Sequence, residues 1–252
     1  MKMREVDDHL NEINIQIAGH VIGIKSKYRI SPTLYANFRT EMKADVYITI
    51  NDEDIDFTRA QKYNLATIKI KPQNVLRKIS EVLLQFDVLL LHGAVVAVNG
   101  KSYLFTAPSG IGKTTHILKW LKHLPDACVV NGDKPFIKFG GDNNTLPMAC
   151  GSPWAGKENM YTNTMVPLNA IILMERSENN HITQISFDEA FPTLLQQTYR
   201  PESIEKMRKT LKLLQRINST VKFYRFQCNN FKDDCFDVAY NALIETDEFP
   251  AC

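Results

Sequence analysis

Residues 107–114 (APSGIGKT) constrain the fold of this 252-residue chain more than any other feature. They follow the phosphate-loop pattern G-x-x-x-x-G-K-[ST], with alanine at the first position, and this pattern has structural meaning only between a strand and a helix. The apolar run 102–106 precedes the loop, and a helical pattern over 114–123 follows it and ends before Pro125. A strand–loop–helix unit is typical of α/β folds, so we expect a sheet with this loop at one edge.

Each residue type in the loop suits phosphate binding. Gly110 and Gly112 let the backbone turn tightly and aim several N–H groups at one point, and the following helix adds the positive end of its dipole. Lys113 supplies a cation for the β- and γ-phosphates, and the Thr114 hydroxyl suits Mg²⁺. The competing interpretation is a chance glycine turn. We predict a nucleotide site formed by Pro108, Ser109, Gly110, Ile111, Gly112, Lys113, Thr114 and Thr115.

Hydrophobic patterning predicts a mixed α/β architecture for the rest of the chain. Alternation and apolar runs predict strands at 11–24 (with a turn near Gly19), 44–50, 65–70, 128–130, 135–139, 168–174 and 221–228. One-sided apolar spacing predicts helices at 73–86, 187–195, 203–217 and 233–244. Asn99-Gly100 between the apolar runs 88–98 and 102–106 predicts a hairpin that enters the middle of the sheet. We expect a small, mostly antiparallel β-rich region over 1–72 and a P-loop domain over 73–252, either separate or continuous.

Charge and cysteine content limit the partners and the compartment. The 30 basic and 28 acidic side chains leave a net charge of +2, which provides no general field for gripping nucleic acid. The five cysteines include no C-x-x-C pair, so neither a disulfide framework nor a zinc site is indicated. The first ten residues are charged rather than signal-like, and no apolar run approaches the ~20 residues of a membrane span. We therefore expect a cytoplasmic protein with no nucleic-acid or membrane partner.

Polar residues interrupt apolar segments at three further places. Asp133 comes shortly after the apolar strand 128–130, where P-loop enzymes carry a Mg²⁺-binding aspartate, although a simple turn aspartate is the alternative. His92 breaks the apolar run 88–98, and on spacing alone such a histidine is more often a core residue than a functional one. Residues 151–158 (GSPWAGKE) suit a substrate loop as well as an ordinary charged turn. Their candidate side chains are Trp154, Lys157 and Glu158.

Together these segments resemble the HPr kinase/phosphorylase family and its shorter relatives, which include kinases of serine in the precursor peptides of ribosomally made natural products. The segments that carry the resemblance are 91–97 (LHGAVVA), 99–101 (NGK), 108–115, 131–135 and 152–158. It spans about residues 91–237 and is strongest at the His-Gly pair and the phosphate loop. The family shares its fold with phosphoenolpyruvate carboxykinases, which implies a P-loop fold with a mixed central sheet.

The resemblance also implies roles for individual residues. His92 would be the active-site histidine beside the phosphoacceptor, and Asp133 would match one of the family's paired aspartates, acting as a metal ligand or as the base. The chain departs from the family because Gly132 stands where the neighbouring aspartate would be. Glu158 is then the candidate for a second carboxylate, and Lys157 for stabilising the transferred phosphoryl group.

Two other departures bear on the acceptor. Thr115 stands where the HPr enzyme usually has an acidic residue, and the long C-terminal signature of the bifunctional HPr enzyme is not evident. Both weaken the expectation of HPr as acceptor and of the reverse phosphorolysis reaction. The HPr enzymes form hexamers, so the resemblance also allows a homo-oligomer.

The sequence therefore predicts a Mg²⁺-dependent kinase that transfers the γ-phosphoryl group of ATP, or of GTP, to a hydroxyl. The leading acceptor is a serine of a peptide or protein. A free small molecule such as serine is one alternative, and a non-catalytic nucleotide-binding regulator is another. A transport or motor NTPase is disfavoured because no second ATPase signature is visible. The catalytic candidates are His92, Lys113, Asp133, Lys157 and Glu158, with Asp133 or His92 as the base and with Thr114 and Asp133 as metal ligands.

Overall fold

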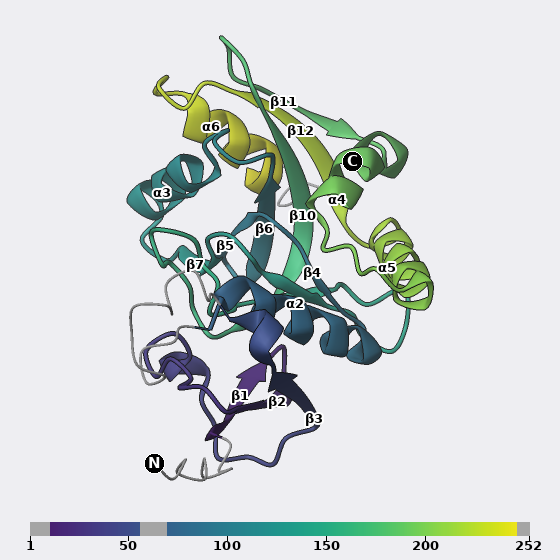
Figure 1. Cartoon of the computed structure of the whole chain (residues 1–252). Coiled ribbons are helices and arrows are strands. Elements are labelled where there is room, and N and C mark those ends of the chain that lie inside the picture. Colours follow the sequence, from purple (N-terminus) through teal and green to yellow (C-terminus); the bar gives the residue numbers. More distant parts are fainter. Residues whose placement is uncertain (1–10, 56–69, 246–252) are drawn as a thin grey trace, which may run out of the picture. The chain divides into compact units, whose positions relative to one another are not determined.

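The computed structural model describes residues 11–55 and 70–245 (Figure 1). The strands are β1 (Asn11–Ile17), β2 (His20–Ser26), β3 (Val46–Ile50), β4 (Val88–Leu90), β5 (Ala94–Val98), β6 (Lys101–Thr106), β7 (Cys128–Asn131), β8 (Phe136–Lys138), β9 (Met148–Cys150), β10 (Met165–Arg176), β11 (His181–Ile185) and β12 (Lys222–Cys228). The helices are α2 (Pro72–Leu83), α3 (Lys113–His123), α4 (Phe187–Gln197), α5 (Ile204–Ile217) and α6 (Cys235–Tyr240), with short 3-10 helices at Ala36–Phe38, Asp52–Asp54 and Leu84–Phe86 and a π-helical turn at Asn241–Glu245. The chain divides into two compact units, residues 1–83 and 84–252.

The first unit contains a sheet of order β1-β2-β3 and the helix α2. Ala18 and Gly19 both have positive φ, which gives β1 and β2 the tight two-residue turn of a twisted hairpin. β3 pairs with β2 in parallel, because a long connection from Ser26 to Val46 returns the chain to the same end of the sheet. Lys78 of α2 binds the Asp54 carboxylate at 2.6 Å. The expected strand at 65–70 lies outside the described residues except for Ile70.

The second unit is built on a nine-stranded mixed sheet, counted over the described residues. β5 and β6 form the hairpin expected from Asn99-Gly100, and both turn residues have positive φ. β10 pairs in parallel with β6 along one side. On its other side it is long enough to pair with two strands, antiparallel with β9 at its start and parallel with β12 further along. Because β6, β10 and β12 are parallel, their carboxyl ends meet at one edge of the sheet, where α/β proteins bind ligands. The phosphate loop follows β6 at this edge.

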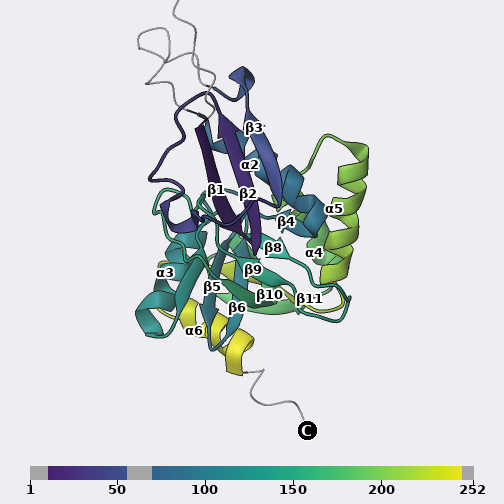
Figure 2. The ribbon, with the colours of Figure 1, turned by 90° about the horizontal axis from the view of Figure 1, so that it is seen from below.

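Helices cover both faces of this sheet (Figures 1 and 2). α4 and α5 bury Leu194, Leu213 and Leu214 in an apolar cluster on one face. α3 and α6 bury Trp120 and Phe236 in a second cluster on the other face, where aromatic rings meet edge to face. The two covered faces explain why the central strands read as nearly continuous apolar runs rather than alternating ones. The site is therefore carried by a packed scaffold.

The expected fold class, a mixed α/β fold with a central mixed sheet and a small N-terminal β region, is confirmed. The sequence did not indicate β9 or β11. β9 has three residues, and β11 lies at an edge of the sheet with mostly exposed side chains, so neither has a strong apolar signature. None of the helices in the described parts of the chain combines the length and the hydropathy needed to cross a membrane.

Candidate active site

The phosphate loop joins β6 to α3 with the geometry that its glycines allow. Gly110 and Gly112 have φ of 85° and 112°, and Gly112 is the left-handed residue immediately before the first turn of α3. The Lys113 side chain is buried, and its Nζ donates to the carbonyl oxygens of Ala107 at 2.8 Å and Pro108 at 3.3 Å. The loop therefore holds its cation at the carboxyl end of β6, where a phosphate would meet the N–H groups of the helix.

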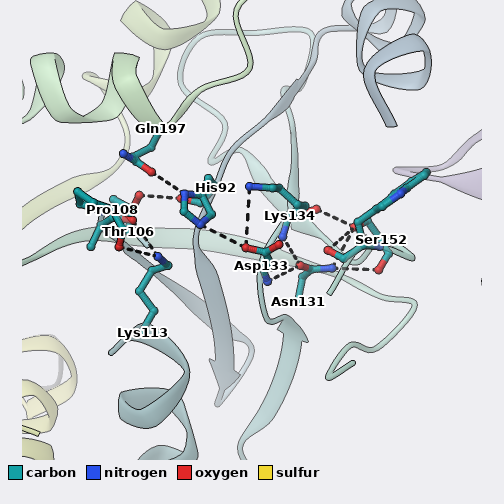
Figure 3. A network of polar contacts seen from close by, with 11 residues as sticks. His92, Thr106, Pro108, Lys113, Asn131, Asp133, Lys134, Ser152 and Gln197 are labelled. Atoms are coloured by element: carbon teal, nitrogen blue, oxygen red, sulfur yellow. Dashed lines mark hydrogen bonds and ion pairs between the residues drawn. The ribbon is translucent and has the colours of Figure 1, made fainter. Parts of the chain in front are cut away.

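His92 is fixed at the break between β4 and β5, next to the strand that leads into the loop (Figure 3). Its backbone N–H donates to the carbonyl oxygen of Gln197 at 2.8 Å, and its own carbonyl oxygen accepts from the Thr106 hydroxyl at 2.8 Å. The next residue, Gly93, donates to the backbone carbonyl of Asp133 at 2.9 Å. The interruption of the apolar run is thus a bend that places His92 between the phosphate loop and Asp133.

Asp133 is held by a turn that depends on Asn131. The fully buried Asn131 side chain accepts from the backbone N–H groups of Asp133 at 2.9 Å and Lys134 at 2.6 Å. Its amide nitrogen donates to the carbonyl and hydroxyl oxygens of Ser152, both at 3.0 Å. Both polar atoms of the Asn131 side chain are therefore hydrogen-bonded. These bonds fix the backbone of the turn and, with it, the direction in which the Asp133 side chain points.

His92 and Asp133 face each other directly. His92 Nε2 lies 3.2 Å from Asp133 Oδ1, and His92 Nδ1 lies 2.6 Å from Gln197 Oε1 (Figure 3). An ionised carboxylate only accepts hydrogen bonds, so this pair requires a proton on His92 Nε2, and the Nδ1–Gln197 contact is a hydrogen bond when Nδ1 is also protonated or when the Gln197 amide is turned so that its nitrogen donates. The Oδ1 atom is then occupied by the imidazole, while Oδ2 has no hydrogen-bond partner among the described residues. Asp133 consequently keeps one oxygen for a ligand or a proton.

Burial and neighbouring charges act together on the ionisable groups. Burial lowers the pKa of Lys113, and Lys134 adds to this, although the Asp133 carboxylate opposes both. Burial alone raises the pKa of Asp133, but the hydrogen bond from His92 and the charges of Lys134, His92 and Lys113 outweigh it and leave the pKa lowered. Asp133 is therefore ionised at neutral pH, and two lysines and a histidine surround one carboxylate.

Two oxygen-bearing side chains at the site suit the preference of Mg²⁺ for hard oxygen donors. Thr114 offers a hydroxyl at the start of α3, and Asp133 offers its free carboxylate oxygen. Residues 11–55 and 70–245 contain no group of three or more histidine, cysteine, aspartate or glutamate side chains placed to hold a metal. Mg²⁺ commonly binds through one or two side chains with phosphate oxygens completing its shell, and the residues present fit that pattern.

The loop of residues 151–158 lies against the turn that carries Asp133, but not through its charged side chains. A Cβ at Gly156 would come within 3.2 Å of the Asp133 Cβ, so the glycine allows the close approach. Lys157 and Glu158 are exposed on the turn that follows, and neither forms a hydrogen bond or ion pair with any described residue. The Trp154 carbonyl instead accepts from Lys134 N–H at 3.1 Å, so this loop helps to position the Asp133 turn.

Gly132, the departure from the paired aspartates, has a steric basis. A Cβ there would lie 2.9 Å from the Ala155 carbonyl oxygen and 3.3 Å from that of Met160. A second carboxylate at this position would force the 155–160 segment to move. The turn thus accommodates a single aspartate, at Asp133.

Two residues at the site were missed by the sequence analysis. Gln197, at the end of α4, is 105 residues from His92 in sequence, and no local pattern signals such a contact. Lys134 is half-buried with its Nζ 3.9 Å from Asp133 Oδ1, and burial lowers its pKa. Its position next to Asp133 in the sequence was a usable signal.

No protein-family model matches the chain, and no curated protein matches it. Among solved structures, the chain is similar to the HPr(Ser) kinase/phosphatase from Coxiella burnetii, with a TM-score of 0.38 and 11% sequence identity. The alignment covers 63% of this chain and 93% of that chain. A likeness at this level is a distant one, so the activity must be judged from the site itself.

Proposed function

We propose that this protein is a Mg²⁺-dependent kinase that transfers the γ-phosphoryl group of ATP to a hydroxyl, with a serine in a peptide or protein as the acceptor. The observation that carries the proposal is the meeting of two independent elements. A phosphate loop with a buried lysine lies beside a His92–Asp133 pair whose N–O distance is 3.2 Å. A structural phosphate site has no need of the second element, whereas phosphoryl transfer needs a group that orients and deprotonates the acceptor.

The chain's own groups divide the work of positioning and charge neutralisation. Backbone N–H groups of the loop and the Lys113 ammonium hold the β- and γ-phosphates. Thr114 would hold Mg²⁺ together with phosphate oxygens, and the metal neutralises phosphate charge when bound, which leaves the free Asp133 oxygen to act as the base. Lys134, rather than the exposed Lys157, is the second cation beside Asp133. Phosphoryl transfer depends mainly on such placement and on little covalent chemistry by the protein.

Asp133 suits the role of base better than His92. The imidazole Nε2 must carry a proton to bind the Asp133 carboxylate, so it has no lone pair to offer an acceptor. The second carboxylate oxygen of Asp133 can accept the proton of an approaching hydroxyl. His92 then orients that carboxylate, and Gln197 orients His92 in turn. A lowered pKa makes Asp133 a weak base, which fits a proton transfer that follows phosphoryl transfer.

The exposure of the site favours an acceptor presented from outside. The side chains of His92 and Asp133 remain 23% and 33% exposed. A serine on an extended peptide can reach groups at this level of exposure, whereas a free small molecule needs an enclosing cavity to be held. For this reason the peptide or protein acceptor is preferred to free serine.

The proposal is tested by mass spectrometry after incubation with Mg·ATP and candidate acceptors. These are serine-containing peptides encoded next to the gene, and free serine as a comparison. The expected result is a mass increase of one phosphoryl group on a peptide serine, absent with Lys113→Ala. Addition to free serine alone would transfer the proposal to a small-molecule kinase.

A non-catalytic nucleotide-binding regulator is the second candidate, because Gly132 leaves the turn with a single aspartate. The same experiment separates the two functions. Tight binding of Mg·ATP without phosphoryl transfer to any acceptor, and without slow hydrolysis, would favour the regulator.

A further inference from the structure

Different residues surround the two sides of the phosphate loop. This difference determines on which side the terminal phosphate and on which side the nucleoside of a bound nucleotide would lie. His92, Asp133 and Lys134 lie on the side of the loop that faces β5 and β7. The transferable phosphate belongs on that side, because the candidate base is there. The nucleoside must therefore leave the loop on another side. β10 runs parallel to β6, and β12 runs parallel to β10. The carboxyl ends of β10 and β12 therefore lie at the same end of the sheet as the loop and flank it on that side.

Two side chains from the ends of these strands contact the loop itself. Arg176, the last residue of β10, donates from Nη2 to the Gly110 carbonyl oxygen at 2.5 Å. Asn230, two residues after β12, donates from its amide nitrogen to the Gly112 carbonyl oxygen at 3.2 Å. A Cβ at Gly112 would collide with the Asn230 side-chain amide, so this side chain packs directly on the loop. The segment after β12 is thus part of the wall of the phosphate site.

This segment, residues 229–232, is braced on several sides. Asn229 accepts through its side chain from the Phe231 N–H at 3.0 Å, and its own N–H donates to Asn180 Oδ1 at 2.6 Å. The Lys232 carbonyl accepts from Lys119 of α3 at 3.1 Å. The backbone of the segment is therefore fixed relative to the helix that begins at the phosphate loop.

The same braced segment presents a bare aromatic ring. Phe231 is 100% exposed, whereas Phe226 and Phe236 on either side of it in sequence are buried. A phenylalanine ring in water contributes no burial free energy to the fold. A loop without bracing contacts could rearrange so that the ring is buried. Here the ring is held out next to Asn230, which itself contacts the phosphate loop. A flat apolar surface at the start of a phosphate site is what a nucleobase needs as a stacking partner.

We infer that Phe231 is the stacking surface for the base of the bound nucleoside triphosphate, and that Asn230 positions it against the phosphate loop. The inference rests on the proposed function only in requiring that the loop binds a nucleotide. It adds a base-binding site at the ends of β10 and β12 to the phosphate and transfer groups on the other side. The base would lie over Phe231, with the ribose between it and the phosphates in residues 108–114.

Calorimetric titration of the whole chain with Mg·ATP and with inorganic tripolyphosphate tests this assignment. Stacking on an aromatic ring is lost in Phe231→Ala, so the affinity for Mg·ATP should fall by about 5- to 100-fold. Tripolyphosphate has no base, so its affinity should be unchanged. Ile204→Ala is the matched control, since Ile204 is an apolar side chain of the same unit that is 73% exposed. It should leave both affinities at the wild-type value.

Phe231→Trp retains an aromatic ring and supplies a probe. It should keep the affinity for Mg·ATP, and its added fluorescence should be quenched by Mg·ATP but not by tripolyphosphate. Phe231→Ala binding Mg·ATP as tightly as wild type would overturn the inference, as would an equal loss of tripolyphosphate affinity. Wild type binding ATP and tripolyphosphate equally would remove the base site but keep the phosphate site. Wild type binding neither would overturn the proposed function as well.

Discussion

The two sides of the phosphate loop differ in how their side chains are held. On the side of β5 and β7, His92, Asp133, Lys134 and Asn131 are linked by hydrogen bonds and ion pairs and are partly or fully buried. On the side of β10 and β12, the backbone is braced but the Phe231 ring is wholly exposed. Reacting atoms require fixed geometry, whereas a base that stacks tolerates some freedom. Substitutions on the side of β5 and β7 should therefore cause large losses of kcat. Substitutions on the side of β10 and β12 should cause smaller, graded losses of affinity for the nucleotide.

Lys113→Ala should have the largest effect, because in the proposed function Lys113 serves both phosphate binding and charge neutralisation. We expect kcat/KM for phosphoryl transfer to fall by about 10⁴-fold. A radiolabelled-ATP assay measures the change, and Lys122→Ala, an exposed lysine of the same helix, serves as the control. Substantial transfer by Lys113→Ala would contradict the account of the loop.

Asp133→Asn should separate transfer from binding. The amide fills the same space but accepts no proton, so kcat should fall by about 10³-fold with a much smaller change in KM for ATP. Steady-state kinetics give both values. Asp126→Asn, an exposed aspartate before β7, should behave as wild type. Loss of ATP affinity alone, with kcat retained, would mean that Asp133 acts only in binding.

Gln197→Leu tests whether the orientation of His92 matters. Removing the 2.6 Å contact with Nδ1 should lower kcat by about 10-fold and leave KM for ATP unchanged, since one hydrogen bond to a charged or polar ring is lost. The exposed neighbour gives the control Gln196→Leu. An unchanged kcat in Gln197→Leu would show that the backbone alone positions the histidine.

Ser186→Ala should have the smallest effect and should act on stability rather than on activity. Ser186 and Glu189 form a capping box at the start of α4, the helix that ends at Gln197. Its loss should lower the free energy of unfolding by about 1 kcal/mol, measured by urea denaturation. These hydrogen bonds lower the pKa of Glu189, so their contribution is present at neutral pH and is lost as the pH falls into the acid range. A tenfold change in kcat would contradict the assignment.

Local signals were sufficient for the scaffold and for the strand–loop–helix geometry of residues 107–114. Asn99-Gly100 fixed the hairpin, and the glycines of 107–114 placed the loop between β6 and α3, because turn geometry is set by a few adjacent residues. The parallel pairing of β3 was not foreseen, since parallel strands meet only through long connections. The contacts that complete the site also join residues far apart in sequence, so local patterns did not predict them.

Position in the sequence alone did not show which charged side chains lie beside Asp133. Lys157 and Glu158 follow a glycine turn that points them into solvent, whereas Lys134 is drawn toward Asp133 by the turn that Asn131 stabilises. Gln197 reaches His92 only because α4 ends beside the start of β5. Such placements follow from packing of distant elements, which residue types alone do not specify.

A crystal structure with Mg²⁺ and a non-hydrolysable ATP analogue tests the central claim most directly. We expect the β-phosphate among the N–H groups of residues 109–114, the γ-phosphate facing Asp133, and the base on Phe231. A nucleotide bound in the reverse direction, or absent from this loop while bound elsewhere, would contradict the account.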